Sequence, residues 1–204
     1  MRNIEKQLEL IWDFQETFQH SQTDSLFIGT AKGRTFRLNL FLEELQEFQE
    51  AIEENDNLEK LDATLDMLYI LGGSIQYHGL GSTFNAFLTG ETDYVNTTIE
   101  NYPNLINKVL HSFSERYLSA KTKLSFSEIL NFYLELVVLV LSLYDKLQSQ
   151  GIVKNDRFDD AFLEVHSSNM SKLDKHGKPI FRKSDGKIMK GPFYYKPNLK
   201  QFLV

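Results

Sequence analysis

Two successive segments of the chain combine carboxylates with apolar residues at helical spacing. Apolar residues recur every three or four positions over residues 35–54 and again over 58–78. This period predicts two amphipathic helices, separated by the polar break at 55–57. Their interleaved acids are Glu43, Glu44 and Glu47 on the first and Glu59, Asp62 and Asp66 on the second. A fold for this chain must therefore place these carboxylates next to a helical core.

The first helix separates its acids into two groups. At 3.6 residues per turn, Glu44 and Glu47 fall on a flank beside the main apolar stripe. Glu43 instead falls on the most polar face, together with Glu50 and Glu54. We therefore expect Glu44 and Glu47 to be half-buried and Glu43 to face solvent.

The second helix carries its acids in one column. Glu59, Asp62, Asp66, Tyr69 and Gly73 follow one another at spacings of three and four residues. Leucines border this column on one side, and further apolar residues border it on the other. A helix that is apolar on both sides of its acids is internal, so we expect the column to face inward.

Buried carboxylates require a compensating cation. Ionised groups without partners are costly to bury, and neighbouring like charges raise each other's pKa. Lys60, the only base in these helices after Arg37, points elsewhere. With no cysteine in the chain, a metal site must use oxygen or histidine, and oxygen ligands favour Mg2+ or Mn2+ over zinc. A solvated acidic face is the alternative for one such helix, but two in succession favour a metal site.

Composition indicates a single globular domain. With 204 residues, 42% of them hydrophobic, the chain can bury its own core. The start of the sequence has no signal-peptide pattern, so we expect a cytoplasmic protein. The most apolar stretch, 132–144, contains Glu135 and is shorter than the roughly 20 residues of a membrane span. It predicts a buried helix.

Charge is divided unequally along the chain. Residues 1–171 carry 13 bases and 26 acids, whereas residues 172–200 carry nine bases and two acids. The net charges are −13 and +7. An acidic body with a basic tail suits a triphosphate bridged to the body by a cation. A nucleic-acid-binding protein is less favoured, because the acidic body would repel phosphates and no recognition motif is present.

The remaining periodicity predicts an all-α bundle. Further helices are expected at 4–19, 102–119, 125–150 and 156–172. Residues 21–33 and 80–100 are expected to be loops. Asp185-Gly186 lies between short apolar runs and predicts a small C-terminal β-hairpin.

The acidic segments and the tail resemble one enzyme family. Residues 42–47, LEELQE, and 59–69, EKLDATLDMLY, resemble the two acidic motifs of the all-α nucleoside triphosphate pyrophosphohydrolases, the MazG-like and HisE-like group. The later segments 164–173, EVHSSNMSKL, and 185–192, DGKIMKGP, resemble its phosphoribosyl-ATP pyrophosphohydrolase-like subgroup, and this match is the more specific one.

The resemblance covers roughly residues 1–80 and 155–200. We therefore expect one domain with metal-site helices at 1–80, a helical insertion at 81–155, and the last helix with the basic tail at 156–204. The insertion would enlarge a pocket, form an oligomer interface or extend the core.

The register of the second motif stays open. If Asp66 is the family's terminal acid, Ala63 stands where an acid is expected and Asp62 substitutes for it. If Glu59 and Asp62 form the motif, Asp66 is an additional acid. Since all three acids share one face, either register leaves a usable site.

The resemblance implies cleavage of a nucleoside triphosphate between the α and β phosphates, giving a monophosphate and pyrophosphate. It implies Mg2+, or Mn2+, as cofactor and a homodimer or homotetramer. The expected metal ligands are Glu44, Glu47, Glu59, Asp62 and Asp66, and the expected general base is Glu43. The residues expected to bind phosphate or nucleotide are Asn169, Lys172, Lys187, Lys190 and Tyr194. The substrate is dUTP or another (d)NTP; the alternatives are phosphoribosyl-ATP or a non-catalytic bundle that binds nucleotide or metal.

Overall fold

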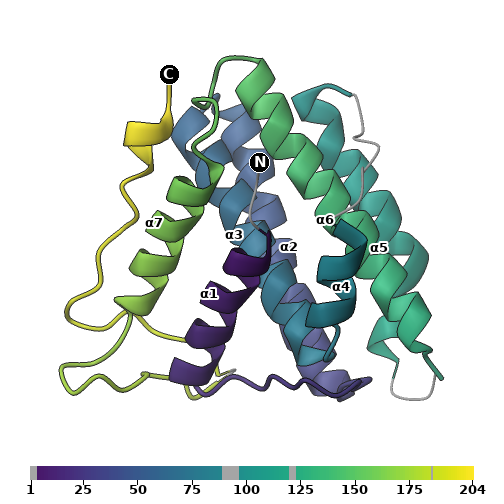
Figure 1. Ribbon diagram of the computed structural model, residues 1–204. Helices are drawn as coiled ribbons and strands as arrows, with labels where there is room; N and C mark the ends of the chain where they lie inside the picture. Colours follow the sequence, from purple (N-terminus) through teal and green to yellow (C-terminus); the bar gives the residue numbers. More distant parts are fainter. Residues whose placement is uncertain (1–3, 89–96, 120–122, 185) are drawn as a thin grey trace.

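The protein is an all-α bundle, as predicted. The computed structural model describes residues 4–88, 97–119, 123–184 and 186–204. In these ranges seven α-helices and two short 3-10 helices are present, without a β-sheet (Figure 1). The α-helices are α1 (Ile4–Thr17), α2 (Ala31–Glu53), α3 (Asn57–Tyr77), α4 (Gly81–Leu88), α5 (Tyr102–Leu118), α6 (Phe126–Ser149) and α7 (Phe158–Met170). The 3-10 helices are η1 (Ile99–Asn101) and η2 (Leu199–Phe202).

Helices α2 and α3 form a hairpin that carries all the predicted carboxylates. The Thr30 side chain accepts a hydrogen bond of 3.0 Å from the Gly33 N–H, and this cap starts α2 four residues earlier than predicted. The Asp56 side chain accepts from the N–H groups of Leu58 and Glu59 and starts α3. The caps fix both helices where the acids lie.

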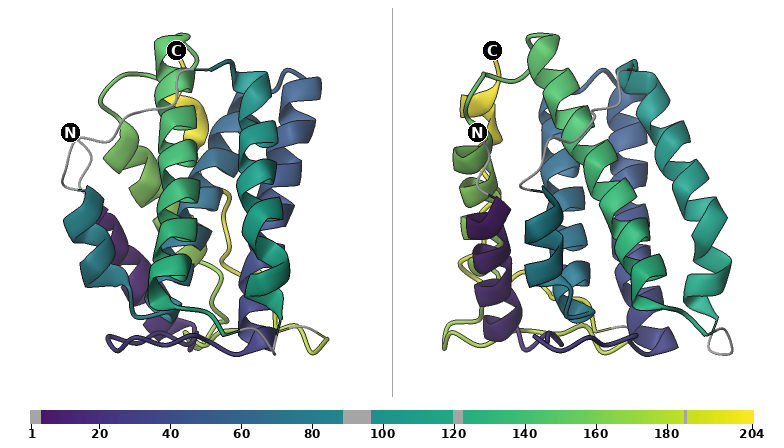
Figure 2. Two further views of the ribbon diagram at one scale, coloured as in Figure 1. Left: turned by 90° about the vertical axis from the view of Figure 1, so that its right-hand side faces the viewer. Right: turned by 45° about the vertical axis from the view of Figure 1, so that its right-hand side comes forward.

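Helix α3 lies in the middle of the bundle, where α2, α6, α1 and α7 pack around it (Figure 2). Leu61, Leu65 and Ile75 of α3 are fully buried. Helix α6 is the one described helix long and apolar enough to cross a membrane, and 61% of its apolar window is buried within the bundle. A core helix passes the same test of length and composition, and the burial of α6 agrees with the predicted core role.

Helix α4 corrects the prediction of a loop over 80–100. The Gly79 backbone turns at a φ of +67°, and α4 then begins at Gly81. Phe84 is only 2% exposed, because α4 packs against α1 and α3. Burial of this ring outweighs the weak helix propensity of a segment rich in Gly, Ser and Thr. Residues 89–96 of the predicted loop lie outside the described residues.

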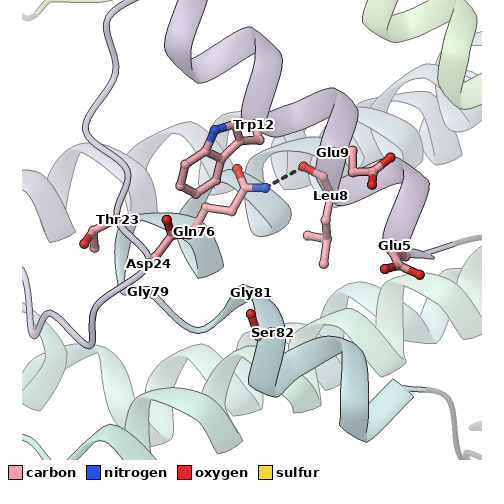
Figure 3. A pocket seen from close by; sticks show the side chains of 10 residues that line it. All are labelled: Glu5, Leu8, Glu9, Trp12, Thr23, Asp24, Gln76, Gly79, Gly81 and Ser82. Atoms are coloured by element: carbon pink, nitrogen blue, oxygen red, sulfur yellow. Dashed lines mark hydrogen bonds between the residues drawn. The ribbon is translucent and has the colours of Figure 1, made fainter.

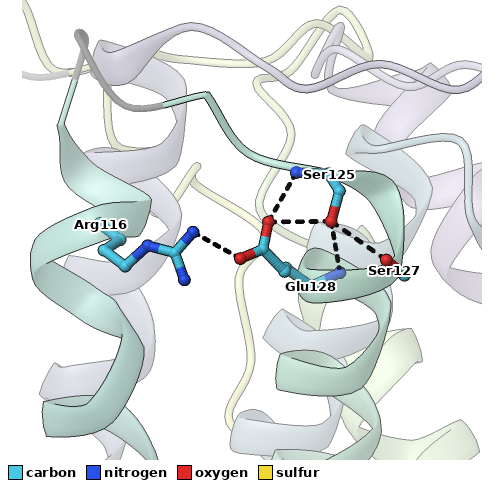
Figure 4. A network of polar contacts seen from close by, with 4 residues as sticks. All are labelled: Arg116, Ser125, Ser127 and Glu128. Carbon is cyan, nitrogen blue, oxygen red and sulfur yellow. Dashed lines mark hydrogen bonds and ion pairs between the residues drawn. The ribbon is translucent and has the colours of Figure 1, made fainter.

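The start of α6 is held by a capping box and an ion pair (Figure 4). The Ser125 hydroxyl accepts from the Glu128 N–H, and the Glu128 carboxylate accepts from the Ser125 N–H at 2.8 Å. Arg116 of α5 forms an ion pair of 2.5 Å with the same carboxylate. The box therefore also joins α5 to α6.

The basic tail turns back along α7 and ends near the start of that helix (Figure 1). Phe181 and Ile188 form an isolated antiparallel bridge at the predicted hairpin, without longer strands. Asp185 of the predicted turn lies outside the described residues. At the chain end, Leu203 forms a second antiparallel bridge with Val153, and η2 packs against α3 and α7. The tail is thus held at both ends.

Candidate functional site

The carboxylates of α2 and α3 lie close enough to perturb one another. The pKa of the half-buried Glu44 is raised to about 9, mainly by burial and also by the charges of Asp66, Glu47 and Asp62. Glu47, which was expected to be half-buried, is instead exposed. Burial still raises its pKa, with Glu59 as the strongest charged neighbour. Acids predicted from two separate helices therefore share one electrostatic environment.

The α3 column behaves in the same way. Burial raises the pKa of Asp62 to about 7, assisted by Asp66 and Glu59. The pKa of Asp66 rises to about 6 through burial, although the charge of Lys172 opposes the rise. Without a cation, the fold thus favours protons on these acids.

The donor set fits a hard cation. The Asp62 Oδ1 atom is buried and has no hydrogen-bond partner. Within the described residues, no three Asp, Glu or His side chains already converge into a complete ligand cluster. The oxygens of these acids are nevertheless the type of ligand that Mg2+ and Mn2+ prefer. An unpaired buried oxygen among mutually repelling carboxylates is what a bound cation would compensate.

Glu43 lies outside the half-buried group, as its helical angle predicted. Its side chain is 47% exposed and forms an ion pair with Lys187 of the tail. The pair joins residues 144 positions apart and brings the 186–190 segment to the middle of α2. Glu43 therefore lies where the tail meets the acidic hairpin.

Three tail lysines approach the acids at separate points. Lys172 lies near Asp66 and Glu44, which oppose the lowering of its pKa by burial. Lys187 pairs with Glu43, and Lys196 lies near enough to Asp62 to oppose the rise in that pKa. Positive charge from the tail is thus spread along the acidic face.

The remaining predicted phosphate-binding residues lie in the same region. Lys172 donates from Nζ to Asn169 Oδ1 at 2.6 Å, at the end of α7. The Lys190 ammonium lies 4.5 Å from the centre of the Tyr194 ring. The positive charge of Lys190 also lowers the pKa of Lys172. Their roles toward a nucleotide stay predictions.

Side chains of α7 hold the tail in place. Ser168 donates from Oγ to the Tyr195 carbonyl at 2.7 Å, and the Tyr195 N–H donates to Ser171 Oγ at 3.2 Å. The Asn198 N–H donates to Glu164 Oε1 at 2.8 Å. These bonds fix the tail backbone on either side of Lys196, whose charge acts on Asp62.

Sequence reasoning missed two features of the site. Lys196 was one of nine tail bases, and no local pattern distinguishes it. The second feature is the contact of His166 with the acidic column: this residue is buried, and its Nδ1 lies 3.0 Å from the Tyr69 hydroxyl. Tyr69 belongs to the acidic column, and its position there was the one sequence signal that it lies at the site.

Part of the chain is similar to a known protein family. The model of the phosphoribosyl-ATP pyrophosphohydrolase family matches residues 11–88, which contain both acidic helices. This part of the chain is thus similar to the phosphoribosyl-ATP pyrophosphohydrolases. The chain is also 22% identical over 242 aligned residues to an uncharacterized protein of Acanthamoeba polyphaga mimivirus, across 96% of this chain and 94% of that relative. No solved structure matches the chain.

Proposed function

We propose that this protein is a Mg2+-dependent nucleoside triphosphate pyrophosphohydrolase that cleaves between the α and β phosphates and releases pyrophosphate. The observation that carries the proposal is the group of mutually perturbed carboxylates on α2 and α3, with Asp62 Oδ1 unpaired, beneath the tail lysines. The family domain at 11–88 supports the same reaction class.

In this proposal the acids hold the cofactor and the tail holds the phosphates. Glu44, Glu47, Asp62 and Asp66 would bind Mg2+, with Glu59 at the edge of the set. Bound Mg2+ neutralises phosphate oxygens and orients a water molecule. Lys172, Lys187, Lys190 and Lys196 approach the acids from the tail side, where a triphosphate would take their charges.

Glu43 is the proposed general base. Its carboxylate is exposed and accepts a hydrogen bond from Lys187, so it can be reached by a water molecule whose proton it would take. Transfer of Lys187 from Glu43 to a phosphate oxygen would free the carboxylate when substrate arrives. Substrate binding and base activation would then be linked through one lysine.

Two substrate classes merit direct comparison. A house-cleaning or pool-controlling role on dUTP or another (d)NTP accommodates the additional helices between α3 and α7. Phosphoribosyl-ATP is the second candidate, because the matching family model carries that name.

We also propose that the protein is cytoplasmic and forms a homodimer or homotetramer. Light scattering on the purified chain would test the oligomeric state.

A substrate panel tests the proposal. The full chain is incubated with NTPs, dNTPs and phosphoribosyl-ATP, with Mg2+ or Mn2+, and pyrophosphate is separated from phosphate. We expect pyrophosphate release from at least one substrate and its loss in Asp66→Asn and Glu47→Gln. Glu54→Gln, at the exposed end of α2, is the charge-matched control and retains activity. Absence of turnover on the whole panel, or equal activity in all three variants, rules the assignment out.

A further inference from the structure

A cleft of about 430 Å³ lies beside α1 (Figure 3). Its walls are α1, the loop after α1, and the junction of α3 with α4. Gln76 is the lining residue from α3, ten positions beyond Asp66, or roughly 15 Å further along the helix axis. The cleft is therefore distinct from the carboxylate site.

Gln76 makes the base of the cleft rigid. Its side chain is almost fully buried and donates from Nε2 to the Leu8 carbonyl at 2.5 Å (Figure 3). Its Oε1 accepts from Gln15 Nε2 at 2.6 Å, and its backbone carbonyl accepts from the Thr23 N–H at 3.2 Å. One residue thus ties α1 and the following loop to α3.

Gly79 keeps the loop close to that base. Its φ is +67°, and a Cβ there would lie 2.1 Å from the Ser25 carbonyl oxygen. Only glycine permits this approach without displacing the loop. The cleft is consequently a preformed part of the fold.

The lining combines one aromatic ring with carboxylates. The Trp12 ring forms a wall, and the Gln22 amide can bridge the Trp12 carbonyl and indole N–H with two contacts of 3.3 Å. Glu5, Glu9 and Asp24 are among the described lining residues, and no Lys, Arg or His is. An indole face and three carboxylates attract a cation and repel phosphate.

We propose that this cleft binds a small organic cation of the aliphatic diamine class. One ammonium group would lie against the Trp12 ring, and the carboxylates of Glu9 and Asp24 would neutralise the charges. Preformed clefts of this size with a few polar groups are typical of small-ligand sites. The proposed hydrolysis needs no such ligand, so the two proposals stand independently.

Trp12 provides the assay, because it is the only tryptophan in the chain. The full chain, without metal or nucleotide and at low ionic strength, is titrated with putrescine while tryptophan emission is recorded. We expect a saturable change that weakens as salt screens the carboxylates. Butanediol, the uncharged counterpart of putrescine, is expected to give no saturation.

Charge variants then locate the site. Glu9→Gln combined with Asp24→Asn is expected to weaken putrescine binding by about tenfold, and Trp12→Leu, followed by calorimetry, by about threefold. Glu115→Gln on α5 removes an exposed carboxylate elsewhere and is expected to bind like the parent protein. The proposal is overturned by an absence of saturable binding, by equal binding of butanediol, or by equal affinity in the double variant and the control.

Discussion

Gly191 lies so close to the Leu173 carbonyl oxygen that a Cβ at residue 191 would be 1.9 Å from it. The Gly191 N–H also donates to the Lys172 carbonyl at 3.1 Å. The two segments of the tail, on either side of the Phe181–Ile188 bridge, are therefore fastened together beside the end of α7. This contact determines where Lys187 and Lys190 lie relative to the acidic hairpin.

Replacing Gly191 by alanine is expected to displace the tail without unfolding the bundle. Loss of the lysine positions should weaken binding of a non-hydrolysable nucleotide with Mg2+ by roughly tenfold, equivalent to about 1.4 kcal/mol. Calorimetry measures the affinity. Gly81→Ala is the control, because the nearest atom to its added Cβ is Gln76 Cγ at 4.0 Å. Equal affinities in the two variants would contradict the role assigned to the tail.

Mg2+ binding is expected to release protons near pH 7. Without metal, the pKa of Glu44 is about 9 and that of Asp62 is about 7, so near pH 7 Glu44 is protonated and Asp62 is partly protonated, and a cation must displace these protons. We expect about one proton released per chain, and tighter Mg2+ binding at pH 8 than at pH 6. Calorimetry in buffers of different ionisation enthalpy measures the release. An enthalpy independent of buffer would show that the acids are already ionised.

The same shifts predict how the stability of the metal-free protein depends on pH. The pKa of Glu44 rises from 4.5 to about 9 in the folded state, so the folded state binds the proton more tightly than the unfolded state. The stabilisation from that proton is complete below pH 4.5 and is lost as pH rises toward 9. Thermal unfolding in a chelator should therefore show a fall in Tm over this range that is smaller in Glu44→Gln. Identical slopes would argue against the shift.

The capping box of α6 allows a separate test of stability. Ser125→Ala is expected to lower the free energy of unfolding by about 1 kcal/mol, through loss of the N-cap. Hydrogen bonds from Ser125 and Arg116 lower the pKa of Glu128 to about 2, so its stabilisation is present above the unfolded value of 4.5 and lost toward pH 2. Urea unfolding should show a cost of Glu128→Gln at pH 6 that diminishes at pH 3. A cost that grows at pH 3 would contradict this sign.

Local spacing was sufficient to predict α2 and α3 and the face of α3 that carries its acids. The period of α3 predicts that Asp62 and Asp66 share one inward face, and the angle of Glu43 on α2 predicts its exposure. Both properties depend on residues within a few turns. The ligand roles of these acids stay predictions.

Contacts between distant segments could not be predicted in the same way. Lys196 lies near Asp62 because the tail folds back along α7 toward α3. The spacing of residues within the tail does not predict this path of the chain. Helix α4 was missed because burial of Phe84 against α1 and α3 stabilises it, rather than its own composition. Such features depend on tertiary contacts between segments that are distant in the sequence.

Asp62→Asn is expected to separate stability from function. The substitution removes one charge from a crowded, half-buried group whose Oδ1 has no partner, so at pH 8 without metal the Tm should be equal to or above that of the parent protein. The increase in Tm that saturating Mg2+ gives the parent should disappear, because a proposed ligand is lost. Differential scanning fluorimetry with and without Mg2+ measures both effects, and Glu54→Gln controls for net charge. A variant destabilised without metal, or one that keeps the full Mg2+ response, would place the cation away from Asp62.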